Sequence, residues 1–238
     1  MKPGRQGALG LLLAAAIIAA WLAIHVAAIF FLDASSILRT LALIVVQTWL
    51  SVGLYIVAHD AMHGSLCPGH RGLNRRVGAL ALWLYAGFSF DKLLPMHHAH
   101  HRAPGMPEDP DFAPMSPDRA LPWYLGFMRT YVGRREVLIM LARVGLYMLA
   151  GAPLQNIVLF FALPGLLSSL QLFWFGTFLP HRNVSDAEFV DSHRSRSNAY
   201  GTLLSLMTCF HFGYHHEHHR FPAAPWWRLP AIRRGSQA

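Results

Sequence analysis

Apolar residues in this chain gather into long unbroken runs rather than alternating with polar ones. Leu9 to Leu32 is a run of 24 residues with one histidine and no formal charge, and Ile37 to Ala58 is a run of 22 residues with a single arginine near its start. At about 1.5 Å per residue, each helix is long enough to cross a hydrocarbon core of about 30 Å. A cleaved signal peptide is the alternative for the first run, but such peptides have much shorter apolar cores. The pattern predicts two membrane-spanning helices and excludes a water-soluble fold with a single core.

The second half of the chain contains two more candidate spans. Val137 to Gly151 is short and carries an arginine, whereas Leu154 to Leu179 is amply long. Pro153 makes a tight connection between them, which is typical of a helical hairpin. We expect Pro164, followed by a glycine, to kink the second of these helices.

Two other apolar runs, 77–90 and 199–213, are shorter than a span and are predicted to be re-entrant or interfacial helices. The histidine groups described below have to meet on one side of the membrane, which requires an even number of crossings between them. The sequence therefore predicts one all-α integral membrane domain over residues 1–238, with a cytoplasmic helical cap. Its four spans are expected near 9–32, 37–58, 137–152 and 154–179.

The distribution of charged residues supports this topology, and it gives a reason other than nucleic-acid binding for the net positive charge. The chain of 238 residues is 54% hydrophobic and 13% charged, with a net charge of +8, and a basic chain suggests nucleic-acid binding. However, nine basic residues lie in 71–135 and seven follow from Arg182, against one, Arg39, between the first two runs. This is the positive-inside pattern. It places both rich segments and both termini on the cytoplasmic face of the cell (inner) membrane. Cys67 and Cys209 lie in these segments, so we expect no disulfide.

Histidine is the residue type that points to chemistry, with 15 in the chain. Most lie in three groups whose spacing puts several rings on one helix face, and one stands alone at the end of the last run. Imidazole suits Zn, Cu, Fe and Ni. Nine candidate ligands are too many for one ion but fit two ions that keep positions for dioxygen or water. The nine are His59, His63, His97, His100, His101, His181, His215, His218 and His219.

The remaining histidines have simpler interpretations. His25 is expected to be a hydrogen-bonding residue inside the membrane, and His70 and His193 to be solvated loop residues. His98 and His216 point off the predicted ligand face, and His211 is left ambiguous. A single cluster is also compatible with an adventitious metal-binding surface or a pH sensor, but three groups on one membrane face argue against that alternative.

Four carboxylates lie close to these groups along the chain. Metal-bound imidazoles commonly donate their other N–H to a carboxylate, and we expect Asp60 to accept such a bond. For Asp109 and Asp111 this role and that of a plain turn carboxylate are equally open. Glu217 is flanked by four histidines, and we interpret it as a functional residue.

The histidine motifs resemble those of the membrane fatty acid desaturase and hydroxylase superfamily. Longer strings are similar to one branch of it, the bacterial-type β-carotene ketolases. The matching strings are AHDAMHGSL (58–66), LYAGFSFD (84–91), HHAHHRAPG (97–105), EDPDF (108–112), GTFLPHR (176–182) and HFGYHHEHHRFPAAPWWRLP (211–230).

The resemblance implies a non-haem di-iron centre held by the nine histidines, with dioxygen as co-substrate. It implies oxidation of C4 of a β-ionone ring to a ketone, from β-carotene to echinenone and then canthaxanthin. Whether hydroxylated rings such as those of zeaxanthin are accepted, giving astaxanthin, is left open, as is the oligomeric state. The sequence has no dinucleotide fingerprint and no cysteine array for an iron–sulfur cluster. An external donor, a ferredoxin or another reductase system, is therefore expected to supply the electrons.

The carotenoid is expected to enter from the bilayer past aromatic side chains near the histidines. Ordinary helix packing or an interfacial belt is the alternative for each of them. Two competing functions remain: oxidation of another lipid on the same scaffold, and metal transport, which would place ligands near the membrane midplane. The candidate substrate-lining residues are Trp83, Tyr85, Phe88, Phe90, Trp174 and Phe175.

Overall fold

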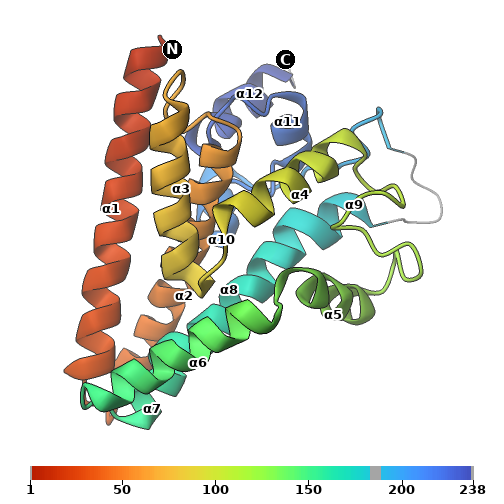
Figure 1. Cartoon of the computed structure of the whole chain (residues 1–238). Coiled ribbons are helices and arrows are strands. Elements are labelled where there is room, and N and C mark those ends of the chain that lie inside the picture. The colour runs from red at the N-terminus through yellow and green to blue at the C-terminus, as the bar shows by residue number, and fades with distance from the viewer. Residues whose placement is uncertain (1, 183–188, 237–238) are drawn as a thin grey trace.

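The computed structural model describes residues 2–182 and 189–236, and every regular element in that part of the chain is helical. The predicted all-α fold is thus confirmed. Helix α1 (Pro3–Phe30) and helix α2 (Ile37–Met62) stand side by side. Figure 1 shows both chain ends at one end of this pair and α7 (Leu154–Ile157) at the other.

Three helices of the described residues are long and apolar enough to cross a membrane: α1, α2 and the continuous helix Leu154–His181. They match three of the four predicted spans, and the chain is a multi-pass membrane protein. Helix α6 (Arg134–Leu149) corresponds to the fourth. Its 16 residues extend about 24 Å, less than a hydrocarbon core, so this crossing stays a prediction.

The helix Leu154–His181 continues through both of its prolines and contains two π-helical turns. It comprises α7, a π-helical turn (Val158–Ala162), α8 (Leu163–Phe173), a second π turn (Trp174–Phe178) and α9 (Leu179–His181). A proline lacks the N–H for the helical bond and its ring collides with an earlier carbonyl. Each π turn directly precedes the segment that holds a proline, Pro164 or Pro180. The kink expected at Pro164 stays a prediction, and the π turns, which are common at functional sites, are an additional feature of this helix.

Helices α3 (Arg71–Ala86) and α4 (Phe90–Arg102) form a pair bent by 99°. Gly87 ends α3 with a φ of 71°, a left-handed conformation that suits glycine. Ser89 then caps α4 by accepting the backbone N–H of Lys92 at 3.3 Å. The bend carries α4 toward α9 and α11 (Figure 1) while its histidines still meet those of α2, so α4 is placed between the elements that hold the other histidines.

The remaining helices are short, as expected for elements that cover the bundle end. They are α5 (Ala120–Tyr131), α10 (Thr202–Cys209), α11 (His215–Arg220), a 3₁₀ turn (Trp226–Arg228) and α12 (Leu229–Ser236). An apolar core that joins α1, α2 and α3 supports them, and Phe210 packs into it. Cys67 and Cys209 are both buried and free, as predicted.

His25 confirms its predicted role as a hydrogen-bonding residue within α1. Its Nε2 lies 2.8 Å from the hydroxyl of Tyr147, and its ring stacks on Trp21 at 4.3 Å between centroids. Since Tyr147 belongs to α6, this bond ties α6 to the first span.

Candidate metal centre

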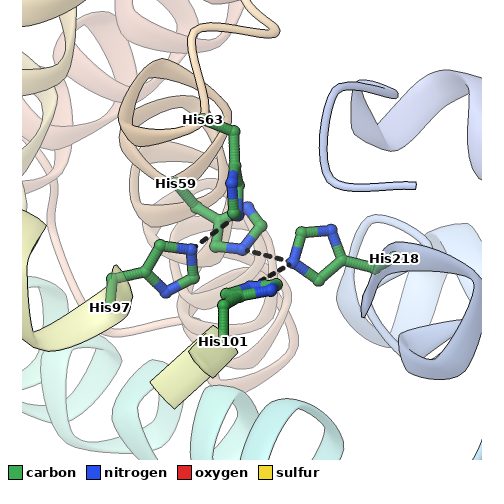
Figure 2. Close-up of side chains that lie close together, drawn as sticks. All are labelled: His59, His63, His97, His101 and His218. Carbon is green, nitrogen blue, oxygen red and sulfur yellow. Dashed lines mark hydrogen bonds between the residues drawn. The ribbon is translucent and has the colours of Figure 1, made fainter. Parts of the chain in front are cut away.

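The structure brings all nine predicted histidines together, and it divides them into two clusters. The five-histidine cluster consists of His59, His63, His97, His101 and His218 (Figure 2), and the four-histidine cluster of His100, His181, His215 and His219. Within each cluster the candidate ligand nitrogens lie within 4.8 Å of one another. No single helix holds either cluster, so both depend on the tertiary fold.

Distances in the five-histidine cluster fit the ligand shell of one metal ion. Nε2 of His218 lies 3.1 Å from Nε2 of His59 and 3.0 Å from Nε2 of His101. Nε2 of His97 lies 2.6 Å from Nε2 of His63. Two nitrogens bound at right angles to one ion, each at about 2.1 Å, would be about 3.0 Å apart. Figure 2 shows the rings pointing toward one another from α2, α4 and α11.

The four-histidine cluster has similar spacing and a nitrogen aimed inward without a partner. Nε2 of His219 lies 3.2 Å from Nε2 of His100 and 3.0 Å from Nε2 of His215. His181 donates from Nδ1 to the carbonyl of Arg194 at 2.8 Å. This bond leaves Nε2 of His181 buried and without a hydrogen-bond partner in the described part of the chain. A buried lone pair of this kind is costly unless it binds something, so the donor set fits a second metal ion.

Helix geometry explains how the histidine motifs are shared between the clusters. At about 100° per residue, positions i and i+4 are about 40° apart, whereas i+3 lies about 60° to the other side of i. In α4, His97 and His101 accordingly join the five-histidine cluster while His100 joins the other. In α11, His215 and His219 belong to the four-histidine cluster, whereas His218, at i+3, belongs to the five-histidine cluster. Each of these motifs therefore bridges the two clusters.

Burial keeps these rings in the neutral form that binds metal. Burial first, and then neighbouring histidines, hold the pKa of His215, His218 and His219 well below the ordinary value. A neutral imidazole offers a lone pair, whereas a protonated ring has none. The α11 histidines are thus prepared to act as ligands.

Asp109 makes the strongest contact between a carboxylate and a candidate ligand. Nδ1 of His100 lies 2.9 Å from its Oδ2, and the backbone N–H groups of Gly105 and Asp111 also donate to it, each at 2.8 Å. Asp111 lies farther from His100, at 3.8 Å, and accepts the hydroxyl of Tyr131. Burial raises the pKa of Asp111 to about 6. Because Asp109 contacts Nδ1 of His100, it directs the other nitrogen, Nε2, toward the four-histidine cluster.

The other two predicted carboxylates are engaged differently from the expectation. Oδ1 of Asp60 lies 3.6 Å from Nδ1 of His59, longer than a hydrogen bond, and its Oδ2 accepts the backbone N–H of Trp226 at 3.1 Å. Glu217 accepts bonds from the hydroxyl of Ser197 and, at 3.0 Å, from Arg233. Glu217 therefore joins α11 to α12, and its carboxylate is directed at these partners rather than at a histidine ring.

The histidines predicted to lie off the ligand face do so. His98 is exposed, with Nε2 3.4 Å from the carbonyl of Met62. Nε2 of His216 lies 3.6 Å from the Asp191 carboxylate. His211 stacks on Tyr214 with an angle of 8° between ring planes. His193, predicted to be solvated, is half-buried, with its ring centroid 6.4 Å from that of His219.

A cavity of about 420 Å³ runs through the apolar part of the molecule to both clusters. Its inner end is lined by two rings of each cluster: His59, His97, His100 and His215. Its outer wall contains Val137, Leu141 and Leu166, which are 42%, 61% and 51% exposed. Because these exposed side chains belong to α6 and α8, the cavity reaches the surface of the molecule at these two helices.

Two of the six predicted substrate-lining aromatics, Tyr85 and Phe88, line this cavity. The other four do not, because each has another packing partner. Phe90 lies in the core against Gly78, Trp83 lies under the guanidinium of Arg143 at 5.0 Å, and Trp174 and Phe175 contact Phe178 and Tyr200 at 5.1 and 6.2 Å between centroids.

Sequence reasoning missed several of the lining residues. Tyr55 and Thr177 stand four positions before a candidate ligand, His59 and His181 respectively. Since i and i+4 share a helix face, that spacing was a usable signal. Phe127, Tyr131 and Phe212 come from other elements, and only the tertiary fold brings them to the cavity.

Comparison with known proteins agrees with the site. The model of the family described as "Fatty acid desaturase" matches residues 34–149 and 128–238. A β-carotene ketolase from a Paracoccus species is 51% identical over 228 residues, covering 95% of this chain and 93% of the relative. A second, from Paracoccus strain PC1, is 49% identical over 238 residues, covering 98% and 96%.

A more distant relative is the zeaxanthin 4-ketolase of Chlamydomonas reinhardtii, which is 36% identical over 244 residues, covering 98% of this chain and 55% of the relative. No solved structure matches the chain. The family match and the two full-length relatives cover nearly all of the sequence that builds the histidine clusters. The chain therefore belongs to the fatty acid desaturase family, in its β-carotene ketolase branch.

Proposed function

We propose that this protein oxidises the C4 methylene of a carotenoid β-ionone ring to a ketone, converting β-carotene to echinenone and then canthaxanthin. The observation that carries the proposal is the cavity, which is lined by exposed aliphatic side chains of α6 and α8 and by rings of both histidine clusters. Its volume lies within the range of about 300–1,000 Å³ usual for small-molecule sites. The ring end of the substrate would enter it, and the polyene would remain in the membrane.

The nine histidines are proposed to hold two iron ions, one in each cluster. A bound iron pair would supply the activation of dioxygen that oxidation of a C–H bond requires. The chain's own contribution is orientation. Asp109 holds the proton on Nδ1 of His100, and the Arg194 carbonyl holds the one on Nδ1 of His181, so that both Nε2 atoms face inward.

The cavity determines which carbon reacts. C4 is allylic, so its C–H bonds are weaker than those of ordinary methylenes. The largely apolar wall of the cavity keeps water from its inner end, and the β-ionone ring must approach the histidines end-on. One round converts the methylene to an alcohol, consuming one dioxygen, two electrons and two protons and releasing water. A second round gives a geminal diol, which loses water to form the ketone.

The electrons are proposed to come from a separate ferredoxin or another reductase system. The sequence contains two cysteines, fewer than an iron–sulfur cluster needs, and both are buried. A shallow surface pocket lined by His63, His98, His101, Arg102 and Pro222 lies at the five-histidine cluster. We propose this side, with both termini, to be cytoplasmic, and residues 1–238 to act as one domain.

Pigment analysis tests the proposed reaction. Expression of the chain in a host that accumulates β-carotene should yield echinenone and canthaxanthin, and anaerobic growth should prevent their formation. A host in which β-carotene persists while another lipid becomes desaturated or hydroxylated would contradict the proposal. His98→Ala is the matched control for substitutions of clustered histidines, because it removes an exposed imidazole next to the ligand set.

A further inference from the structure

Helix α6 forms one wall of the cavity, yet apolar packing does little to hold it in place. Of its 16 residues, all of which the structure describes, two are buried, and both carry charge: Glu136 and Arg143. Burial of apolar surface is the usual means of fixing a helix, so α6 depends on polar contacts instead. The cavity-lining side chains of α6 are Val137, Met140, Leu141 and Val144.

Arg143 attaches α6 to the end of α3. Its guanidinium donates to the carbonyl of Leu84 at 2.9 Å and to that of Trp83 at 2.7 Å, and it lies 5.0 Å from the centre of the Trp83 ring. Both carbonyls belong to the last turn of α3, where four carbonyls lack a partner within the helix and the helix dipole is negative. A cation at this place is stabilised by the hydrogen bonds and by the dipole together.

Helix α3 is a firm attachment point, because it packs into the apolar core. Its residues Ala81, Leu82 and Leu84 are buried there. At the end of α3, a Cβ on Gly87 would lie 2.6 Å from Cγ2 of Ile139, so α6 approaches this end closely. The lightly packed α6 therefore takes its position from α3.

The polar contacts and the cavity lining lie on adjacent faces of α6. At about 100° per residue, Glu136, Arg143 and Tyr147 fall on one stripe, and the lining side chains lie about 90° from it. Along this stripe, Tyr147 contacts His25 of α1 at 2.8 Å, and Oε2 of Glu136 lies 3.6 Å from Nζ of Lys92 in α4. Any rotation or outward movement of α6 would break these contacts and displace the cavity wall at the same time.

Two simpler roles for Arg143 do not fit its surroundings. An arginine that only escapes the membrane interior would extend to the surface, whereas Arg143 is buried. The ion pairs of lysine and arginine among residues 2–182 and 189–236 do not include it. A charged side chain inside a predicted span is costly, which makes it a candidate for function.

We propose that Arg143 is a positioning residue for the substrate: by holding α6 against the end of α3, it keeps the cavity in the shape that receives the β-ionone ring. This inference rests on the proposed ketolase function. Arg143 itself does not line the cavity, so it acts through the lining side chains of its own helix. Without it, fewer molecules have the receptive cavity, and the apparent affinity for substrate falls in proportion to that fraction.

Separate measurement of KM and kcat in the full-length, iron-loaded protein tests the inference. Arg143→Met removes both hydrogen bonds and keeps a long side chain. KM for β-carotene should rise about 10- to 100-fold, the effect of one hydrogen bond to a charged group, while kcat at saturating substrate stays within about 2-fold. Arg143→Lys keeps a cation near the same carbonyls and should give an intermediate KM.

Arg134→Met is the matched control, because Arg134 lies in the same helix and is exposed. It should leave KM and kcat at the parent values. A second readout is the binding of β-carotene to metal-free protein in detergent, with the bound pigment measured by its absorbance after gel filtration. The affinity should fall in Arg143→Met by the same factor by which KM rises.

The outcomes separate the inference from the proposed function. An unchanged KM in a folded Arg143→Met protein would overturn the inference. A loss of kcat, iron and thermal stability at unchanged KM would do so as well, since it would show support of the general fold alone. If Arg143→Met does not fold, Arg143→Gln, which is too short to reach both carbonyls, gives the same decision. Absence of ketone from the parent protein would overturn the proposed function, and binding of β-carotene to the metal-free variants would still decide the role of Arg143.

Discussion

The two histidine clusters differ in how the fold surrounds them. All four histidines of the four-histidine cluster are buried, and two of them have an acceptor for Nδ1, Asp109 for His100 and the Arg194 carbonyl for His181. In the five-histidine cluster, His63 and His101 are half-buried and line the shallow surface pocket. The five-histidine cluster has more candidate ligands, whereas the four-histidine cluster is more deeply buried and has two rings with an outer acceptor.

The difference shows two ways of fixing a metal site. Five imidazoles restrain an ion by number, and each ring depends less on an outer hydrogen bond. Four imidazoles would leave more coordination positions open, so the direction of each ring would matter more, and outer partners supply it for His100 and His181. We therefore expect the four-histidine cluster to be more sensitive to single substitutions and the five-histidine cluster to be more accessible to solutes.

The largest effect is expected for His181→Ala. His181 stands outside the three histidine motifs, yet it supplies one of four nitrogens in its cluster. Loss of an outer partner usually costs about 10- to 100-fold in metal affinity or activity, and loss of a ligand should cost more. Ketone yield in a β-carotene host and iron content of the purified variant check this. Near-normal turnover in a well-folded His181→Ala protein would contradict the nine-ligand proposal, whereas His98→Ala and His216→Ala should retain most activity.

Asp109→Asn should have the next largest effect. The amide can no longer accept hydrogen bonds through both atoms, so His100 loses its firm orientation, and activity should fall by about 10- to 100-fold. Asp60→Asn is the comparison, because Asp60 lies 3.6 Å from His59. It should affect ketone formation less. Equal losses in the two variants would show that the outer contacts of the clusters do not differ as described.

Chelation should remove the two ions at different rates. A soluble chelator can approach the five-histidine cluster through the surface pocket at His63 and His101, so iron should leave in two phases, the first from this cluster. In His63→Ala the fast phase should shrink, because the site is already weakened. A single phase in the parent protein would indicate that the clusters are equally accessible.

Glu217→Gln should have the smallest effect on activity. Its carboxylate pairs with Arg233 at 3.0 Å, so its loss should mainly weaken the attachment of α12, by about 1 kcal/mol. A lower melting temperature with unchanged iron content is the expected result. Loss of iron at an unchanged melting temperature would restore the functional role that the sequence suggested for Glu217.

Hydropathy predicted the fold well where the runs were long. Residues 9–30 of the first run, and all of 37–58 and 154–179, fall in helices long enough to cross a membrane. The pattern was less informative before Pro164, because the π turn over Val158–Ala162 has no signal in hydropathy. The amino-acid sequence pattern alone does not predict this π turn.

Spacing predicted the clustered histidines, but not their division between two clusters. His97, His100 and His101 look alike in the sequence, and the direction of α4 relative to α2 and α11 decides which cluster each ring joins. The same holds for the acids. Asp60 is next to a candidate ligand in the chain, yet Asp109, nine residues from His100, makes the direct contact. The loop that brings it back could not be derived from local pattern.

We propose above that each of the two histidine clusters holds one iron ion. Metal analysis of purified, fully active protein, with iron and zinc measured together against protein concentration, tests it most directly. We expect about two iron ions per chain, with zinc in either site accompanied by a matching loss of activity, because zinc has no redox chemistry. Full activity with one iron ion or fewer per chain would contradict it.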